Sequence, residues 1–219
     1  MMTDEQRFLF DLNGYLVLEG VLDAERVKRM NKDMLDHDIK EPENSPDQSR
    51  FGNFLKWGDD WRELIDHPAV LPLLTEILGS KFRLDHAYGM AARAGGKTSP
   101  HEYLHHESGM FDHGCYYVTH GKRMHNGLIV VSYALTDIKP GAGGFCCIPG
   151  THKTQQPMPH ECKRIMNNPL VKQIPQKAGD VVIFTEALTH GTMPWTDAAG
   201  ERRSVLLKYC PGYKKKKKN

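Results

Sequence analysis

The sequence predicts a mostly β domain with flanking helices, in which a helical part of about 1–80 precedes a β-rich core of about 81–210. Apolar residues recur at helical spacing in the first part and gather in short runs in the second. Turns such as PGAGG separate these later runs, and no helical pattern lies between them. This arrangement favours an antiparallel sandwich or barrel over an α/β sheet.

The first elements are short and each has a recognisable start. A helix at residues 3–11 begins after Thr3, a residue type that caps helix N-termini. A strand follows at 15–18. Asp23 is a second cap, and the apolar residues behind it share one face of a helix that extends to about residue 38.

Residues 40–58 change in composition to Pro, Ser, Asn and Gly, which predicts a long loop. Helices return at 59–66 and 68–79, the second with a clear apolar stripe. Beyond Gly79 the pattern becomes that of strands. The expected strands are 81–93, 127–136, 145–148, 180–185 and 204–209.

Composition restricts the class of protein. The chain has 219 residues, enough for one domain with a sizeable core, and we expect that domain to span residues 1–213. No apolar run approaches the ~18 residues of a membrane-spanning helix, and the N-terminus lacks the pattern of a secretory signal. We therefore expect an intracellular, cytoplasmic protein. Five cysteines without a CxxC pair do not indicate a disulfide framework or a zinc knuckle.

The net charge of +2 is dominated by the C-terminal tail, residues 214–219. Five of the 29 basic residues are Lys214–Lys218, which leaves 24 against 27 acidic residues in the body, a balance of −3. A mildly acidic body does not indicate nucleic-acid binding. We expect the tail to be solvated and disordered, because adjacent like charges repel one another.

Histidines and one carboxylate have the spacing of metal ligands. On a strand, His105 and Glu107 point to the same face because side chains alternate. His190 follows an apolar run, DVVIFTEALTH, at the turn where a strand is expected to end. Two histidines and one carboxylate match the facial triad of non-haem iron(II) oxygenases. Spacing alone leaves a chance occurrence open, since many unrelated proteins contain such a triplet.

Arg202 is the candidate anion-binding residue. It starts the strand RRSVLLKY, and its planar guanidinium suits a bidentate pair with a carboxylate. The alternative is that Arg202 and Arg203 are surface charges on a strand edge, an interpretation that fits at least one of the two.

Four segments occur in an order that resembles a known family: LHHESG, HNGLIVVSYALTDIKPGAGGFCCIPGTHK, AGDVVIFTEALTHGTMPW and ERRSVLLKY. From Phe8 to Tyr209 the chain resembles the phytanoyl-CoA dioxygenase family. The resemblance implies a double-stranded β-helix, the cupin-like jelly roll, and dependence on Fe(2+) and 2-oxoglutarate. It implies that the iron ligands are His105, Glu107 and His190. It also implies that Arg202 binds the distal carboxylate of 2-oxoglutarate, with Thr192 assisting and His106 near the cosubstrate.

The implied reaction is hydroxylation of a C–H bond of a small-molecule substrate, with consumption of O2 and release of succinate and CO2. Two features depart from the family pattern: Glu107 stands where the family has Asp, and the interval from His190 to Arg202 is longer. A carboxylate at position 107 argues against halogenation, which needs a small residue there. The alternative function is a catalytically silent jelly-roll binding protein with a basic tail.

The polar segment 106–126 is expected to lie over the mouth of the site. Its aromatic and basic side chains suit an anionic substrate of moderate size, and a solvated lid is the alternative interpretation. No membrane or nucleic-acid partner is expected.

Overall fold

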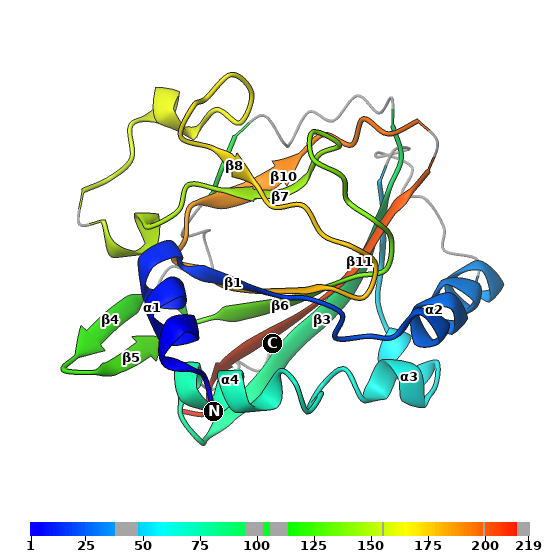
Figure 1. The fold of residues 1–219 in the computed structure, drawn as a ribbon, viewed down its shortest axis with the longest axis horizontal. Coiled ribbons are helices and arrows are strands. Elements are labelled where there is room, and N and C mark those ends of the chain that lie inside the picture. Colours follow the sequence, from blue (N-terminus) through cyan, green and yellow to red (C-terminus); the bar gives the residue numbers. More distant parts are fainter. Residues whose placement is uncertain (38–47, 95–102, 106–113, 155, 199, 214–219) are drawn as a thin grey trace, which may run out of the picture.

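The computed structural model describes residues 1–37, 48–94, 103–105, 114–154, 156–198 and 200–213. Figure 1 shows two β-sheets facing each other, with helices along the far side of the larger sheet. This is the predicted fold class, a mostly β jelly roll with flanking helices. Residues 40–47 of the predicted 40–58 loop and the tail at 214–219, which was predicted to be disordered, lie outside the described residues.

The larger sheet has six antiparallel strands in the order β1-β9-β6-β11-β3-β2. Their bounds are β1 (Tyr15–Leu18), β2 (Gln48–Phe51), β3 (Phe82–Ala92), β6 (Ile129–Ala134), β9 (Val181–Thr185) and β11 (Arg202–Pro211). The smaller sheet is ordered β10-β7-β8, with β7 (Gly144–Cys147), β8 (Lys172–Gln173) and β10 (His190–Met193). A separate hairpin joins β4 (Tyr117–His120) to β5 (Arg123–Asn126).

Helices α1, α2 and α3 begin where the sequence predicts, whereas α4 begins at Leu71, three residues later than the expected residue 68. The bounds are α1 (Asp4–Asn13), α2 (Ala24–Asp36), α3 (Asp59–Arg62) and α4 (Leu71–Leu78), with short 3-10 turns η1 (Phe54–Lys56), η3 (Thr151–Lys153) and η4 (His160–Lys163). Thr3 caps α1 in a capping box with Gln6. The Asp23 side chain caps α2 by accepting from the Arg26 N–H at 2.8 Å.

Two apolar layers hold the fold together. Helix residues such as Met30 and Trp61 pack against Val131 and Leu207 on the outer face of the larger sheet. A second layer fills the space between the two sheets, where Phe145 from β7 meets Phe184 from β9 with ring centroids 4.5 Å apart. The candidate site packs against this inner layer, since the Phe184 ring contacts His190.

Some elements differ from the prediction. Strand β2 lies inside the segment 40–58, which was predicted to be a loop. The strand was not predicted because its short polar sequence, QSRF, shows no alternation of apolar residues. Its anchor is Phe51, whose ring fills the space over Gly89; a Cβ there would lie 1.9 Å from the ring. Helix α3 ends at Arg62, earlier than the expected residue 66.

His152, on the 3-10 turn η3, packs against the end of α1. Its side chain is buried, and its Nε2 lies 3.0 Å from the Asp11 carbonyl oxygen. The ring also packs edge-on against Tyr117 at 4.6 Å. A Cβ on Gly14, where α1 ends with φ of 80°, would lie 2.6 Å from Nδ1, so only glycine fits beside the ring.

Burial of His152 should make the free energy of unfolding depend on pH. Burial lowers its pKa to about 4, more than the Asp11 carbonyl raises it. The unfolded chain therefore binds more protons as pH falls below about 6.5, and the folded state loses up to about 3 kcal/mol by pH 4. Above about pH 6.5 the imidazole is neutral in both states and contributes no pH dependence.

Urea denaturation of the wild type and His152→Gln across this range measures the effect. The difference in the free energy of unfolding between the two proteins should shrink as pH falls. The control is His125→Gln, which changes an exposed histidine and should show the same pH dependence of stability as the wild type. A difference that stays constant with pH would show that His152 titrates normally in the folded protein.

Within the described ranges, no helix is both long and apolar enough to cross a membrane.

Candidate metal and cosubstrate site

Two of the three predicted metal ligands lie side by side. His105 and His190 form an isolated antiparallel bridge, with N–H to carbonyl distances of 2.8 and 2.9 Å in the two directions. Directly opposed residues of an antiparallel pair point to the same side. The two imidazole centroids are accordingly 4.4 Å apart. His190 thus begins a strand, β10, where the sequence pattern indicated only a turn.

The His190 ring is held in the tautomer that a metal ligand needs. It is 5% exposed and lies 4.8 Å from the Phe184 ring. Its Nδ1 is 2.6 Å from the Leu188 carbonyl oxygen. A carbonyl only accepts hydrogen bonds, so Nδ1 carries the hydrogen and the lone pair of the neutral ring is on Nε2. This backbone contact is typical of histidines that bind metals through the other nitrogen.

The third predicted ligand, Glu107, and its neighbour His106 lie outside the described residues. Among the residues that are described, no three His, Cys, Asp or Glu side chains are close enough together to hold a metal ion. The assignment of Glu107 therefore stays a prediction.

Arg202 is a buried cation with an unsatisfied donor. It is 5% exposed, and burial lowers the pKa of its guanidinium to about 10, which leaves it protonated at neutral pH. Its Nη2 is buried without a hydrogen-bond partner in the described structure. Its alkyl chain passes Gly144 of β7, where a Cβ would lie 3.5 Å from Arg202 Cδ. A buried guanidinium with an open donor fits an anion such as the distal carboxylate of 2-oxoglutarate.

Arg203 faces the other way. Its Nε lies 2.6 Å from Glu201, and its Nη1 lies 3.1 Å from the Asn31 side-chain oxygen on α2. Thr192, the predicted helper of Arg202, is half-buried on β10 opposite Phe145. It shares a face of β10 with His190, because residues two apart on a strand point the same way.

One charged pair near the histidines has no clear signal in the sequence. Glu186 directly follows β9 and is 4% exposed, and its carboxylate pairs with Lys208 of β11 at 2.6 Å. The two residues are 22 positions apart in the sequence and match no motif. The only hint is that Lys208 lies an even number of residues after Arg202, and so on the same face of β11.

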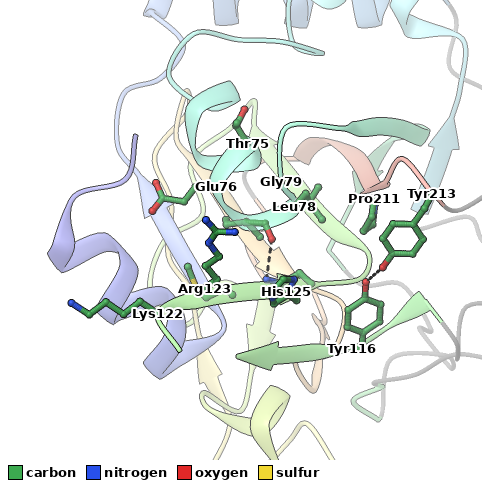
Figure 2. Close-up of a pocket in the computed structure, with 13 residues that line it drawn as sticks. Thr75, Glu76, Leu78, Gly79, Tyr116, Lys122, Arg123, His125, Pro211 and Tyr213 are labelled. Carbon is green, nitrogen blue, oxygen red and sulfur yellow. Dashed lines mark hydrogen bonds between the residues drawn. The ribbon is translucent and has the colours of Figure 1, made fainter. Parts of the chain in front are cut away.

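The hairpin does not cover the site as expected. Figure 2 shows Tyr116, Lys122 and Arg123 around a different cavity, of about 410 Å³, beside the end of α4. Tyr116 and Tyr213 share a hydroxyl hydrogen bond at one wall. Tyr117 instead donates a hydrogen bond to Asp11. The expectation that these residues lie over the metal was wrong, since the hairpin packs on α4; residues 106–113 are outside the described part.

Several solved structures with the same fold contain iron, 2-oxoglutarate or both. HygX from Streptomyces hygroscopicus, solved with nickel, 2-oxoglutarate and hygromycin B, is 23% identical with a TM-score of 0.84, covering 97% of this chain and 88% of that one. Another HygX structure has iron bound. At this identity the likeness shows the fold.

Two relatives from nogalamycin biosynthesis are similar over most of their length. The epimerase SnoN is 19% identical, with a TM-score of 0.67, and the match covers 95% of this chain and 82% of SnoN. SnoN has been solved with Fe3+, α-ketoglutarate and nogalamycin RO. The carbocyclase SnoK is 16% identical, with a TM-score of 0.69 and coverage of 96% and 84%. The predicted cofactors, iron and 2-oxoglutarate, are therefore those of its structural relatives.

No curated protein matches the chain. The sequence model described as phytanoyl-CoA dioxygenase (PhyH) does match it, over residues 10–204. That range includes both paired histidines, the buried Arg202 and nearly all of the two sheets, and on this match the chain belongs to the phytanoyl-CoA dioxygenase family.

Proposed function

We propose that the chain is an Fe(2+)- and 2-oxoglutarate-dependent dioxygenase that hydroxylates a C–H bond of a small-molecule substrate and releases succinate and CO2. Family membership supports the enzyme class. One observation in this chain carries the proposal further. A pair of opposed histidines and a buried arginine with an open donor occur at the positions to which the family resemblance assigns iron and 2-oxoglutarate binding.

In this proposal His105, Glu107 and His190 hold the iron, and Arg202 pairs with the distal carboxylate of 2-oxoglutarate, assisted by Thr192. Bound iron and 2-oxoglutarate supply the oxidative chemistry by activating O2. The chain's own contribution is orientation. The Leu188 carbonyl holds the His190 ring, and the inner apolar layer around Phe145 and Phe184 keeps water from that side of the site.

The described residues fit both groups. Imidazole nitrogens suit Fe(2+), and a facial set of three ligands leaves positions open for a chelating cosubstrate and O2. The Arg202 guanidinium, protonated despite its burial, supplies a positive charge for a dianion. We also propose that residues 1–213 make up one oxygenase domain and that the tail at 214–219 is not needed for catalysis.

The substrate is proposed to be a small molecule, since the relatives were solved with hygromycin B and with nogalamycin RO. An anionic group on the substrate is not part of the proposal, because Lys122 and Arg123, two basic residues of the segment that suggested it, line the cavity beside α4. Because SnoN is an epimerase and SnoK a carbocyclase, the reaction type needs its own test. Hydroxylation adds one oxygen atom to the product, which mass spectrometry distinguishes from epimerisation or ring closure.

Anaerobic titration tests the proposal directly. Adding Fe(2+) and 2-oxoglutarate to the wild type should produce a weak visible charge-transfer band, and Glu107→Ala should weaken both the band and the binding of iron. The matched control is Glu161→Ala, an exposed carboxylate on η4 that should leave the band unchanged.

Absence of the band in the wild type, together with no metal binding by calorimetry, would favour the silent binding protein. A band of wild-type strength in Glu107→Ala would instead show that the third ligand is another residue. Asp112 would then be the next carboxylate to test.

A further inference from the structure

The Glu186–Lys208 ion pair lies on the side of the larger sheet that faces the proposed metal site, and it has no part in the proposed binding of iron or 2-oxoglutarate. The Glu186 N–H donates to the Leu128 carbonyl at 3.0 Å, so the residue extends the β9–β6 pairing by one step. Its side chain therefore shares a face with Phe184, two residues earlier. Phe184 packs on the His190 ring. The carboxylate is thus on the same inner surface as the histidine pair.

The pKa of Glu186 reflects charges on the same side of the sheet. Burial raises the pKa of its carboxyl, but the imidazoles of His190 and His105 and the ammonium of Lys208 lower it more, so the pKa lies below its usual value. Glu186 is therefore ionised at neutral pH. An ionised carboxylate beside two imidazoles has the chemistry of a third iron ligand.

Glu186 nevertheless does not join the histidines. No described group of three such side chains is close enough to hold a metal. The carboxylate is instead held by Lys208, whose Nζ is 2.6 Å from Oε1 and whose side chain is 14% exposed. Lys208 is itself fixed on β11, opposite Val130 on one side and His86 on the other, with its ammonium 5.9 Å from the Tyr88 ring.

We propose that Lys208 is a positioning residue that holds the Glu186 carboxylate away from the metal, which keeps the coordination positions of 2-oxoglutarate and O2 open. The inference rests on the proposed function. Without the ammonium, the carboxylate is a buried charge without a partner, a costly state that metal coordination relieves. A fourth protein ligand would then occupy a position that the cosubstrate needs.

Three variants of the full chain test this: Lys208→Met, Glu186→Gln and the double variant. Calorimetry under anaerobic conditions gives the Kd of Fe(2+), and the charge-transfer band gives the Kd of 2-oxoglutarate. Lys208→Met should bind Fe(2+) about tenfold more tightly and 2-oxoglutarate about tenfold more weakly. The double variant should return both constants to within about threefold of the wild type, because no carboxylate remains to compete.

Opposite movement of the two constants, with rescue by the second change, is a result that general damage to the fold does not produce. Glu186→Gln alone leaves an unpaired ammonium near the histidines and should weaken Fe(2+) binding only. The control is Lys139→Met, which removes an exposed lysine from the surface pair with Asp197, 3.5 Å apart, and should change neither constant.

The outcomes separate the two proposals. A wild type that binds neither Fe(2+) nor 2-oxoglutarate overturns the proposed function. A wild type that binds both, with 2-oxoglutarate affinity unchanged in Lys208→Met or with a double variant as impaired as the single one, overturns the role of Lys208. If thermal unfolding shows that Lys208→Met does not fold, Lys208→Gln replaces it, because glutamine keeps a hydrogen-bond donor for Glu186. The Kd of Fe(2+) should then fall and the Kd of 2-oxoglutarate should rise, each by less than in Lys208→Met.

Discussion

Replacing Arg202 by lysine is expected to weaken 2-oxoglutarate binding by roughly tenfold to a hundredfold, whereas Arg203→Lys should leave it within about twofold of the wild type. Lysine keeps the charge but loses the planar fork that pairs with both oxygens of a carboxylate. A charge-assisted hydrogen bond contributes about 1.5–3 kcal/mol, which corresponds to that range of affinities. The charge-transfer band, titrated with 2-oxoglutarate under anaerobic conditions, measures it.

The structure explains why only one of two adjacent arginines should matter. Arg202 is 5% exposed with an open Nη2 donor, and Arg203 is engaged with Glu201 and Asn31 on the helix side of the sheet. Alternation along β11 forces this opposition. Arg203→Lys should therefore lower the free energy of unfolding slightly. A loss of 2-oxoglutarate affinity in Arg203→Lys, and not in Arg202→Lys, would show that the register of the family match is wrong by one residue.

Local sequence signals predicted the elements whose structure depends on local interactions. The Thr3 and Asp23 caps mark the starts of α1 and α2 because their side chains bond to the backbone within one turn. The long apolar run at 127–136 marks β6, which is buried on both faces. In contrast, β2 and β10 were not predicted as strands, because their sequences, QSRF and HGTM, contain no apolar run.

The same division applies to the site. His105, His190 and Arg202 are predicted from residue types and an order that follow a family pattern, and the structure pairs the two histidines and buries the arginine. His190 starts a strand opposite His105. This pairing joins distant parts of the chain, and the spacing of residues in the sequence does not reveal it. The Glu186–Lys208 pair was missed for the same reason. Its partners come from β11 and the end of β9, and only the β9–β6–β11 pairing brings them together.

His190→Gln is expected to weaken Fe(2+) binding at least about 100-fold, since even changes to groups that only orient a ligand cost 10- to 100-fold. Glutamine fills much of the imidazole volume against Phe184 and Phe145, so the inner layer should stay packed. Anaerobic calorimetry with Fe(2+) measures the loss, and thermal unfolding without metal checks that the fold is kept.

The matched control for this change is His125→Gln, which alters an exposed histidine of β5. It should bind Fe(2+) like the wild type. The comparison is sharp because the two histidines differ in their surroundings: a backbone carbonyl and two aromatic rings fix the ring of His190, and it shares a bridge with His105. Wild-type affinity in His190→Gln would mean that the paired histidines do not form the metal site, since a facial set of three ligands does not retain iron when one is removed.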